Sequence, residues 1–184
     1  MSERPIVIAG SGLAGWTVAR ELRALSSDRP ITLVTANSGD FYSKPMLSNA
    51  FAQGKSPANL LQATGAAQAA KYDVTLMANT TVTSIEAAQR TLQVGSTQLP
   101  YGDLVLALGA APVRLSLPGA ASICSVNDWW DYAAFRDRMS RAPNPAAVRV
   151  VILGAGLIGC EFANDLAGAG HSVTLVDPAE RTLN

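Results

Sequence analysis

The chain has 184 residues, of which 48% are hydrophobic and 15% charged, a composition typical of globular proteins and not of disordered ones. Its 14 basic residues balance its 14 acidic residues, so charge gives no reason to expect a nucleic-acid or anionic-membrane partner. No apolar run reaches the roughly 18 residues of a membrane span. Arg4-Pro5 leads directly into a short apolar run, which is unlike a signal peptide. We therefore expect a cytoplasmic protein without membrane insertion.

The first 35 residues predict a strand, a glycine turn, a helix and a second strand. Residues 6–9 form a short, continuous apolar run, as expected of a strand covered on both faces. The run enters Gly10-Ser11-Gly12-Leu13-Ala14-Gly15, and a helical pattern follows as far as Leu25. A second apolar run at 31–34 completes one βαβ unit.

The same plan recurs near the end of the chain. Residues 148–153 predict a strand that enters Gly154-Ala155-Gly156-Leu157-Ile158-Gly159. A helix is expected to continue to about Ala169, and a second strand at 173–176 ends at Asp177. A doubly wound sheet needs further strands, so we expect this second unit to be truncated.

The middle of the chain has a different texture. Residues 73–100 predict short strands separated by turns, residues 104–108 predict a buried strand, and residues 127–141 predict a helix with Asn127 as its N-cap. The fold class is thus α/β, with two Rossmann-like three-layer dinucleotide-binding domains, the first carrying a small antiparallel β insertion. The expected division is a discontinuous FAD-binding segment 1–112, a linker 113–147 with a helix, and the incomplete start of an NAD-binding domain, 148–184.

Each glycine of such a loop has a physical role. The first permits the tight turn out of the strand, the second lets the backbone approach a pyrophosphate, and the third lets the helix pack closely on the strand. The helix N-terminus adds N–H groups and a partial positive charge. One copy is weak evidence, because structural turns also contain glycines, but two copies between apolar strands predict two dinucleotide sites.

The residue that ends the second strand of each unit is expected to meet the adenosine ribose. Asp177 stands there in the second unit, and a carboxylate accepts hydrogen bonds from ribose hydroxyls and repels a 2′-phosphate. NADH is therefore favoured over NADPH, although Arg181 lies close in sequence and tempers this preference. In the first unit the position is Thr35, followed by Ala36 and Asn37, so a hydroxyl, an amide or the backbone must hold the ribose.

These features resemble the flavin-dependent pyridine nucleotide–disulfide oxidoreductase superfamily. Its Ala-Thr-Gly motif is similar to Ala107-Leu108-Gly109, with Leu108 in place of the usual Thr. The sequence is more closely similar to rubredoxin–NAD(+) reductases, through Tyr42-Ser43-Lys44-Pro45-Met46-Leu47-Ser48 and through the whole of 151–166. The resemblance covers essentially the entire chain.

The resemblance implies roles for particular residues. The first loop would bind FAD and the second NADH, Lys44 would touch the flavin, the Val82 backbone would meet the adenine side, and Glu161 would lie near the flavin and the nicotinamide. The alternatives are that Lys44 is a solvated loop residue and that Glu161 only favours the helix dipole. The full set of expected cofactor-binding residues is Gly10, Ser11, Gly12, Leu13, Ala14, Gly15, Thr35, Ala36, Lys44, Pro45, Val82, Ala107, Gly109, Gly154, Gly156, Leu157, Ile158, Gly159, Glu161 and Asp177.

Cysteine usage narrows the expected chemistry. Cys124 and Cys160 match neither a metal-ligand spacing nor the redox pair of disulfide reductases. We therefore expect no metal and no catalytic side chain: the flavin itself passes electrons from NADH to a docked carrier. Rubredoxin is the favoured acceptor, as in alkane hydroxylation systems. The alternatives are a ferredoxin of an oxygenase system, a flavin-binding NADH-sensing protein without carrier activity, and a fragment that binds no cofactor.

Three smaller expectations complete the sequence interpretation. The 184 residues alone are expected to bind FAD poorly, because in the family a later segment completes the FAD domain. His171 is expected to be structural and to lie at the surface before a strand. The aromatic residues from Trp129 to Phe135 are either a docking patch or, more often in such helices, a packed face.

Overall fold

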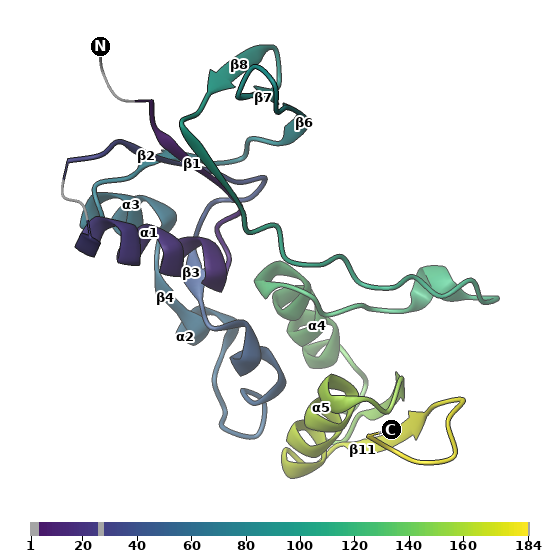
Figure 1. Cartoon of the computed structure of the whole chain (residues 1–184). Helices are drawn as coiled ribbons and strands as arrows, with labels where there is room; N and C mark the ends of the chain where they lie inside the picture. The colour runs from purple at the N-terminus through teal and green to yellow at the C-terminus, as the bar shows by residue number, and fades with distance from the viewer. Residues whose placement is uncertain (1–3, 26–27, 184) are drawn as a thin grey trace. The chain divides into compact units, whose positions relative to one another are not determined.

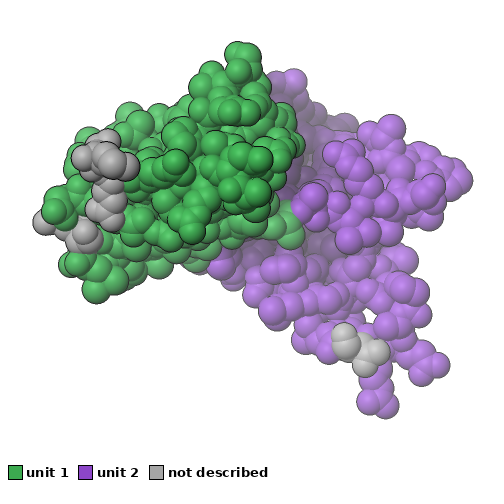
Figure 2. Space-filling view, turned by 45° about the horizontal axis from the view of Figure 1, so that its top comes forward, with its two compact units in different colours: residues 1–42, 61–110 green, residues 43–60, 111–184 purple. Residues whose placement is uncertain are grey.

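The structure is a computed structural model that describes residues 4–25 and 28–183 (Figure 1). The chain divides into two compact units (Figure 2). Unit 1 comprises Met1–Tyr42 and Leu61–Ala110, and unit 2 comprises Ser43–Leu60 and Ala111–Asn184. The segment that carries Lys44 thus packs with the second unit, although it lies early in the sequence.

Unit 1 is built on a parallel sheet of four strands in the order β5-β2-β1-β9. The expected strands at 6–9 and 31–34 are present, and every residue in both is buried. The strand expected at 104–108 begins and ends slightly earlier, and the prediction that it is buried was wrong, because none of its four residues is buried. The bounds are β1 (Ile6–Ala9), β2 (Ile31–Val34), β5 (Thr75–Met77) and β9 (Asp103–Leu106).

This sheet lies between helices and a second, antiparallel sheet (Figure 1). On one face, Ile8 and Leu33 pack against Trp16 and Ala19 of the first helix. On the other face, Val7 and Val34 pack against Leu92 and Val94 of the antiparallel sheet. Adjacent strand residues therefore serve opposite faces, as strand geometry requires. The surrounding elements are α1 (Leu13–Leu25), α3 (Gly65–Lys71), β6 (Val82–Glu86), β7 (Thr91–Val94) and β8 (Thr97–Pro100).

The three layers confirm the predicted α/β class and the antiparallel insertion. The structure adds two features that the sequence pattern did not reveal. Strand β5, within the region expected to hold only the insertion, joins the parallel sheet beside β2. A short antiparallel pair, β3 (Phe41–Tyr42) with β4 (Leu61–Ala63), forms where the chain leaves unit 1 and returns to it.

Unit 2 contains the second βαβ arrangement. Strands β10 (Arg149–Leu153) and β11 (Ser172–Val176) are parallel and are joined by α5 (Leu157–Gly168). Burial alternates along both strands, so one face of each is exposed. The remaining elements are the 3-10 helices η1 (Lys44–Ser48) and η2 (Ala120–Ser122), the short helix α2 (Pro57–Leu60), and α4 (Trp129–Ser140).

Helix α4 begins later than expected. Asp128, not Asn127, is its N-cap, because the Asp128 carboxylate accepts a hydrogen bond from the Asp131 backbone N–H at 2.8 Å. A charged acceptor at this position also favours the helix dipole. The Asn127 backbone N–H instead donates to the side chain of Asp131. The prediction of Asn127 as the cap was therefore wrong by one residue.

The aromatic residues of α4 mainly form a packed face. Tyr132 is fully buried, and Phe135 makes edge contacts with Phe51 and Phe162. Trp130 is partly exposed. His171 is buried, not at the surface as expected: its Nδ1 accepts a hydrogen bond from the Val148 N–H, and its ring meets Phe51 edge-on. The contact with the Phe51 ring covers the imidazole, although the neighbouring residues Gly170 and Ser172 are exposed.

Among the residues that the structure describes, no helix has the length and apolar character needed to cross a membrane.

Candidate dinucleotide-binding sites

The first glycine of each loop has nearly the same backbone conformation. Gly10 has a φ of 107° and Gly154 a φ of 108°, values that side chains with a Cβ rarely adopt. Each residue's N–H donates at 2.8 Å to the last residue of the neighbouring strand, Gly10 to Val34 and Gly154 to Val176. The tight turn out of β1 and β10 therefore requires glycine at both positions.

The third glycine of each loop permits close packing of its helix. A Cβ on Gly15 would lie 1.9 Å from the carbonyl oxygen of Gly10, and a Cβ on Gly159 would lie 2.0 Å from that of Gly154. Such distances are far below van der Waals contact. The helix can thus approach the strand end only because both residues lack a side chain.

The second glycine of each loop faces open space. A Cβ on Gly12 or on Gly156 would meet nothing within 4 Å, so packing within the protein does not explain the choice of glycine there. Both residues stand immediately before a helix, where the first-turn N–H groups have no partner within the helix. A pyrophosphate placed there would contact these groups without meeting a side chain, so the loops fit a dinucleotide.

The apolar residues that follow these glycines are exposed. Leu13 and Ala14 in α1, and Leu157 and Ile158 in α5, all belong to the first helical turn. Their exposed fractions reach 66% at Leu157. Large exposed apolar side chains beside a glycine loop are consistent with a surface that a ligand or further chain covers.

In unit 1 the expected site residues gather at the carboxyl ends of the parallel strands. The Ala107 N–H donates to Ala9, and a Cβ on Gly10 would lie 2.2 Å from the Ala107 oxygen. The Thr80 N–H donates to the Thr35 carbonyl, which brings the start of β6, at Val82, beside the end of β2. The strands that follow β1 in the sequence add to the sheet first on the β2 side and later, with β9, on the opposite side of β1. The strand order therefore changes direction at β1. Ligands of open α/β sheets bind at such a switch point.

The Thr35 side chain points into the protein. It is only 5% exposed, and its hydroxyl lies 2.8 Å from the Ser11 hydroxyl and 2.9 Å from Asn37 Oδ1. Asn37 Oδ1 also accepts from the Gly39 N–H. This network fixes the loop after β2 against the glycine loop. It leaves the exposed backbone around Ala36 as the part of this segment that faces solvent.

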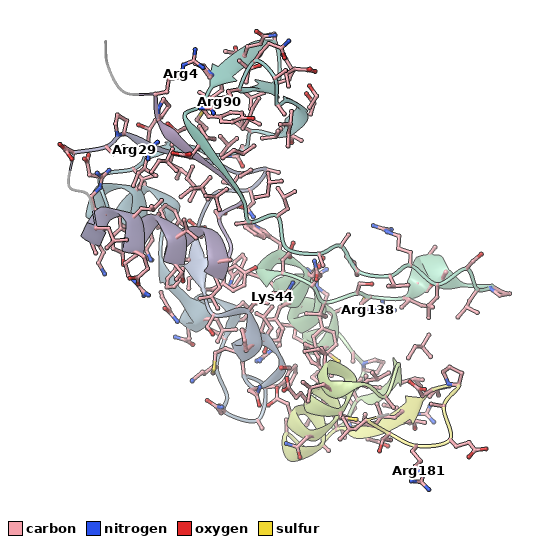
Figure 3. The ribbon with its side chains drawn as sticks, in the orientation of Figure 1. Arg4, Arg29, Lys44, Arg90, Arg138 and Arg181 are labelled. Carbon is pink, nitrogen blue, oxygen red and sulfur yellow. The ribbon has the colours of Figure 1, made fainter. Side chains whose placement is uncertain are left out.

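In unit 2 the equivalent position carries a charge. Asp177 Oδ2 accepts from the Ala155 N–H at 2.7 Å, and Oδ1 accepts from the Ala179 N–H at 2.8 Å. These backbone hydrogen bonds, the one from Ala155 first, lower the pKa of the Asp177 carboxyl. An ionised carboxylate has about four lone-pair sites, so two remain for ribose hydroxyls. Arg181, labelled in Figure 3, is exposed and follows the exposed Glu180.

Lys44 and Glu161 both lie in unit 2, and each side chain forms a hydrogen bond with another residue of that unit and not with the other. The ammonium of Lys44, labelled in Figure 3, donates to Asn127 Oδ1 at 2.8 Å. Glu161 Oε2 accepts from the Ser48 hydroxyl at 2.6 Å. Ser48 is buried, whereas Lys44 and Pro45 are exposed. The loop thus presents its lysine and proline to solvent and anchors its serine to helix α5.

Sequence analysis missed one charged residue of this region. Asp165, one helical turn after Glu161, is only 5% exposed, and its two oxygens accept from the backbone N–H groups of Phe51 and Ala52 at 2.8 and 2.9 Å. The sequence did contain one indication of its position: Asp165 is four residues after Glu161, and residues four apart share one face of a helix. Nothing local indicated a partner more than a hundred residues away.

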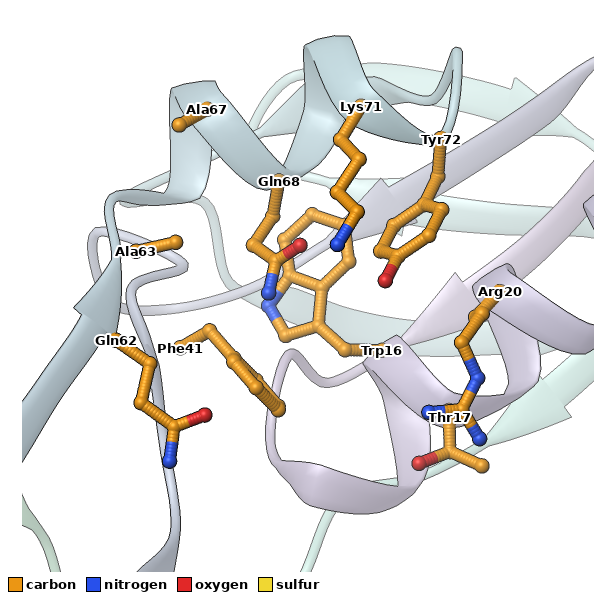
Figure 4. A pocket seen from close by; sticks show the side chains of 10 residues that line it. All are labelled: Trp16, Thr17, Arg20, Phe41, Gln62, Ala63, Ala67, Gln68, Lys71 and Tyr72. Carbon is orange, nitrogen blue, oxygen red and sulfur yellow. The ribbon is translucent and has the colours of Figure 1, made fainter.

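One further cavity lies in unit 1, with a volume of about 420 Å³ (Figure 4). Its walls include Trp16, Phe41 and Tyr72, and the side chain of Lys71 reaches into it from α3 (Figure 4). None of the expected cofactor-binding residues lines it. The cavity therefore shares no residue with the expected glycine-loop site.

Comparison with known proteins agrees with this geometry. The profile of the family described as pyridine nucleotide-disulphide oxidoreductase matches residues 4–184. The chain is 41% identical over 185 aligned positions to a rubredoxin-NAD(+) reductase of Acinetobacter baylyi, covering 97% of this chain and 46% of that protein. The chain therefore spans about half the length of the curated relatives it matches.

Solved structures give the same result. A ferredoxin reductase from Rhodopseudomonas palustris aligns with a TM-score of 0.84 and 31% identity, over 98% of this chain and 44% of that one. The reductase–carrier complex of putidaredoxin reductase with putidaredoxin aligns with a TM-score of 0.83 and 30% identity, over 100% of this chain and 44% of that one. The similarity confirms the sequence-based resemblance to the reductases.

Proposed function

The chain belongs to the pyridine nucleotide-disulphide oxidoreductase family, and from this premise we propose that it is part of an FAD-dependent reductase that passes electrons from NADH to rubredoxin. The observation that carries the proposal is the repetition of one glycine-loop geometry in two units, with φ near 107° at both first glycines and open space at both second glycines. A protein that moves electrons between two dinucleotides needs two such sites.

The two loops have different ligands in this proposal. The loop from Gly10 to Gly15, with Thr35, Ala36, Val82, Ala107 and Gly109, binds FAD. The loop from Gly154 to Gly159, with Asp177, binds NADH, because the carboxylate accepts hydrogen bonds from the ribose hydroxyls and repels a 2′-phosphate. The corresponding division of the chain is a discontinuous FAD-binding segment 1–112, a linker 113–147 with a helix, and the incomplete start of an NAD-binding domain, 148–184.

The chain's own groups bind and orient, and the flavin supplies the redox chemistry when bound. Lys44 and Pro45, exposed on η1, would contact the flavin ring, and the ammonium would favour added negative charge on that ring. Glu161 borders the nicotinamide side. No side chain is required as a general acid or base.

The cysteines support direct electron transfer to a separate carrier. Cys124 and Cys160 are both free, and the Cys160 thiol donates to the Ala155 carbonyl within its own loop. These two cysteines therefore do not form a dithiol that could relay electrons from the flavin to the acceptor. The name of the Acinetobacter baylyi relative includes rubredoxin, and the cytoplasm is the compartment that we propose for the reaction.

A ferredoxin is the second candidate acceptor, because a similar solved structure is a ferredoxin reductase. Steady-state reduction of rubredoxin and of a ferredoxin by the full-length protein, with NADH as donor, separates the two. We expect rubredoxin to give the higher kcat/KM. Equal or better turnover with ferredoxin would exclude the first assignment, and absence of NADH-dependent flavin reduction would exclude both.

A further inference from the structure

The contacts of helix α5 indicate a role for a residue outside the expected site. Asp165 is almost fully buried, and its two carboxylate oxygens accept hydrogen bonds from two successive backbone N–H groups, those of Phe51 and Ala52. A buried carboxylate is costly unless it is hydrogen-bonded, and each bond to a charged group is stronger than a neutral one. The pair of bonds therefore fixes the loop at residues 51 and 52 firmly to α5.

A second contact holds the same loop one helical turn earlier. Ser48 donates to Glu161 at 2.6 Å, and Glu161 and Asp165 share one face of α5 because they are four residues apart. Farther along this face, a Cβ on Gly168 would lie 3.3 Å from the Ala52 Cβ. Helix α5 thus meets the loop from Glu161 to Gly168, first through Ser48 and then through residues 51 and 52.

Helix α4 closes the other side of this contact. The Arg136 guanidinium lies over the Phe51 ring at 3.9 Å, and Arg136 also donates to the Lys55 carbonyl at 2.9 Å and to the Tyr132 hydroxyl at 3.0 Å. Burial raises the pKa of Tyr132, so its hydroxyl stays neutral. The loop is therefore held between two helices of the same unit, by Asp165 on α5 and by Arg136 on α4.

The two ends of this arrangement bear on the proposed reaction. Helix α5 begins at the glycine loop assigned to NADH, and η1 carries Lys44 and Pro45, assigned to the flavin. We propose that Asp165 is a positioning residue for hydride transfer: its carboxylate sets the flavin-contacting loop against the nicotinamide-binding helix. The proposal rests on the proposed function. A misplacement of about 1 Å can slow such a reaction about 100-fold.

The test is the variant Asp165→Asn in the full-length, flavin-loaded protein. An amide has one acceptor oxygen, so it accepts from one N–H and turns its own NH₂ toward the other, while the side-chain volume is unchanged. Two quantities are measured: hydrogen–deuterium exchange of peptides spanning 49–55, and flavin reduction by NADH in a stopped-flow instrument, which gives the limiting rate and the Kd for NADH.

We expect exchange at 51 and 52 to rise at least about tenfold and the limiting rate to fall about tenfold, the equivalent of about 1.4 kcal/mol. The Kd for NADH should stay within about twofold, because the second glycine loop and Asp177 are untouched. A purely structural role would not lower the limiting rate of flavin reduction while leaving the Kd for NADH unchanged. Ser48→Ala, which keeps both bonds to Asp165, should lower the rate less.

Asp137→Asn is the matched control, since Asp137 is an exposed acid of α4 paired with Arg141, and it should change neither quantity. Unchanged exchange in Asp165→Asn would overturn the anchoring of the loop. Raised exchange with an unchanged limiting rate would overturn the positioning role. Failure of the wild-type flavin to be reduced by NADH would instead reject the proposed function, and the positioning role with it.

Discussion

The two glycine loops are nearly identical in geometry but sit in different surroundings. In unit 1 every residue of β1 and β2 is buried, whereas in unit 2 burial alternates along β10 and β11. A Cβ added to the third glycine would nevertheless lie at nearly the same distance from the carbonyl oxygen of the first glycine in both loops, 1.9 Å in unit 1 and 2.0 Å in unit 2. Loop geometry is therefore set locally, by the glycine pattern, and does not depend on how fully the neighbouring strands are covered.

The loops differ in the group that follows the second strand. In unit 1 the Thr35 hydroxyl is used inside the protein, together with Ser11 and Asn37. In unit 2 the Asp177 carboxylate binds the loop backbone and keeps lone pairs for a ligand. The same fold position thus stabilises the loop in both units, but only unit 2 has a charged group there, the group to which the proposed function assigns the choice of NADH over NADPH.

The largest expected effect is on stability, and it compares the third glycine of the two loops. Gly15→Ala places a methyl group on the Gly10 carbonyl in a fully packed unit, and we expect a loss of about 3 kcal/mol in the free energy of unfolding. Gly159→Ala makes the same collision beside a half-exposed strand that can yield, so we expect about 1 kcal/mol. Urea denaturation followed by circular dichroism measures both, and equal losses would show that surroundings do not matter.

The second comparison assigns a ligand to each loop. Gly12→Ala and Gly156→Ala add a methyl group that meets nothing in the protein, so neither should prevent folding. Gly12→Ala should reduce the affinity for FAD, and Gly156→Ala the affinity for NADH, each about tenfold, or about 1.4 kcal/mol. Flavin absorbance per chain and titration with NADH measure the two affinities. If Gly12→Ala weakened NADH binding and Gly156→Ala weakened FAD binding, the ligands assigned to the two loops would have to be exchanged.

A smaller effect is expected at Asp177. Asp177→Ala removes the proposed ribose acceptor and its charge, so NADH should bind about fivefold more weakly, the equivalent of about 1 kcal/mol, while binding of NADPH should improve relative to NADH. The ratio of kcat/KM for the two coenzymes measures this. An unchanged ratio would mean that Arg181 or another group sets the preference.

The smallest effect concerns the pH dependence of stability. Hydrogen bonds from Ala155 and then Ala179 lower the pKa of Asp177 from its usual 3.8. Because the folded pKa lies below the unfolded one, the stabilisation is present above the unfolded pKa and is lost as the pH falls through the folded pKa. The chemical shift of the Asp177 carboxyl carbon, followed by nuclear magnetic resonance as the pH is lowered, should therefore have its midpoint below pH 3.8 in the folded protein. A midpoint at or above 3.8 would contradict the two backbone hydrogen bonds.

Local patterns predicted both βαβ units because strand burial and glycine turns are written in adjacent residues. The N-cap at Asp128 was missed because Asn127 beside it is an equally good cap, and only the backbone geometry decides between neighbours. The contacts of Asp165 and Ser48 with distant partners could not be predicted, since they depend on how the loop at 43–60 folds back onto α5. Long-range hydrogen bonds leave no local pattern.

The tryptophans described above also have a spectroscopic consequence. The chain has three: Trp16 is buried in unit 1, with its indole N–H donating to Gly39, whereas Trp129 donates to Pro57 in unit 2, beside Trp130. Intrinsic fluorescence therefore carries a separate signal from each unit. In the variant Trp16→Phe, all remaining indole emission comes from unit 2, so the unfolding of the two units can be followed independently without any added dye.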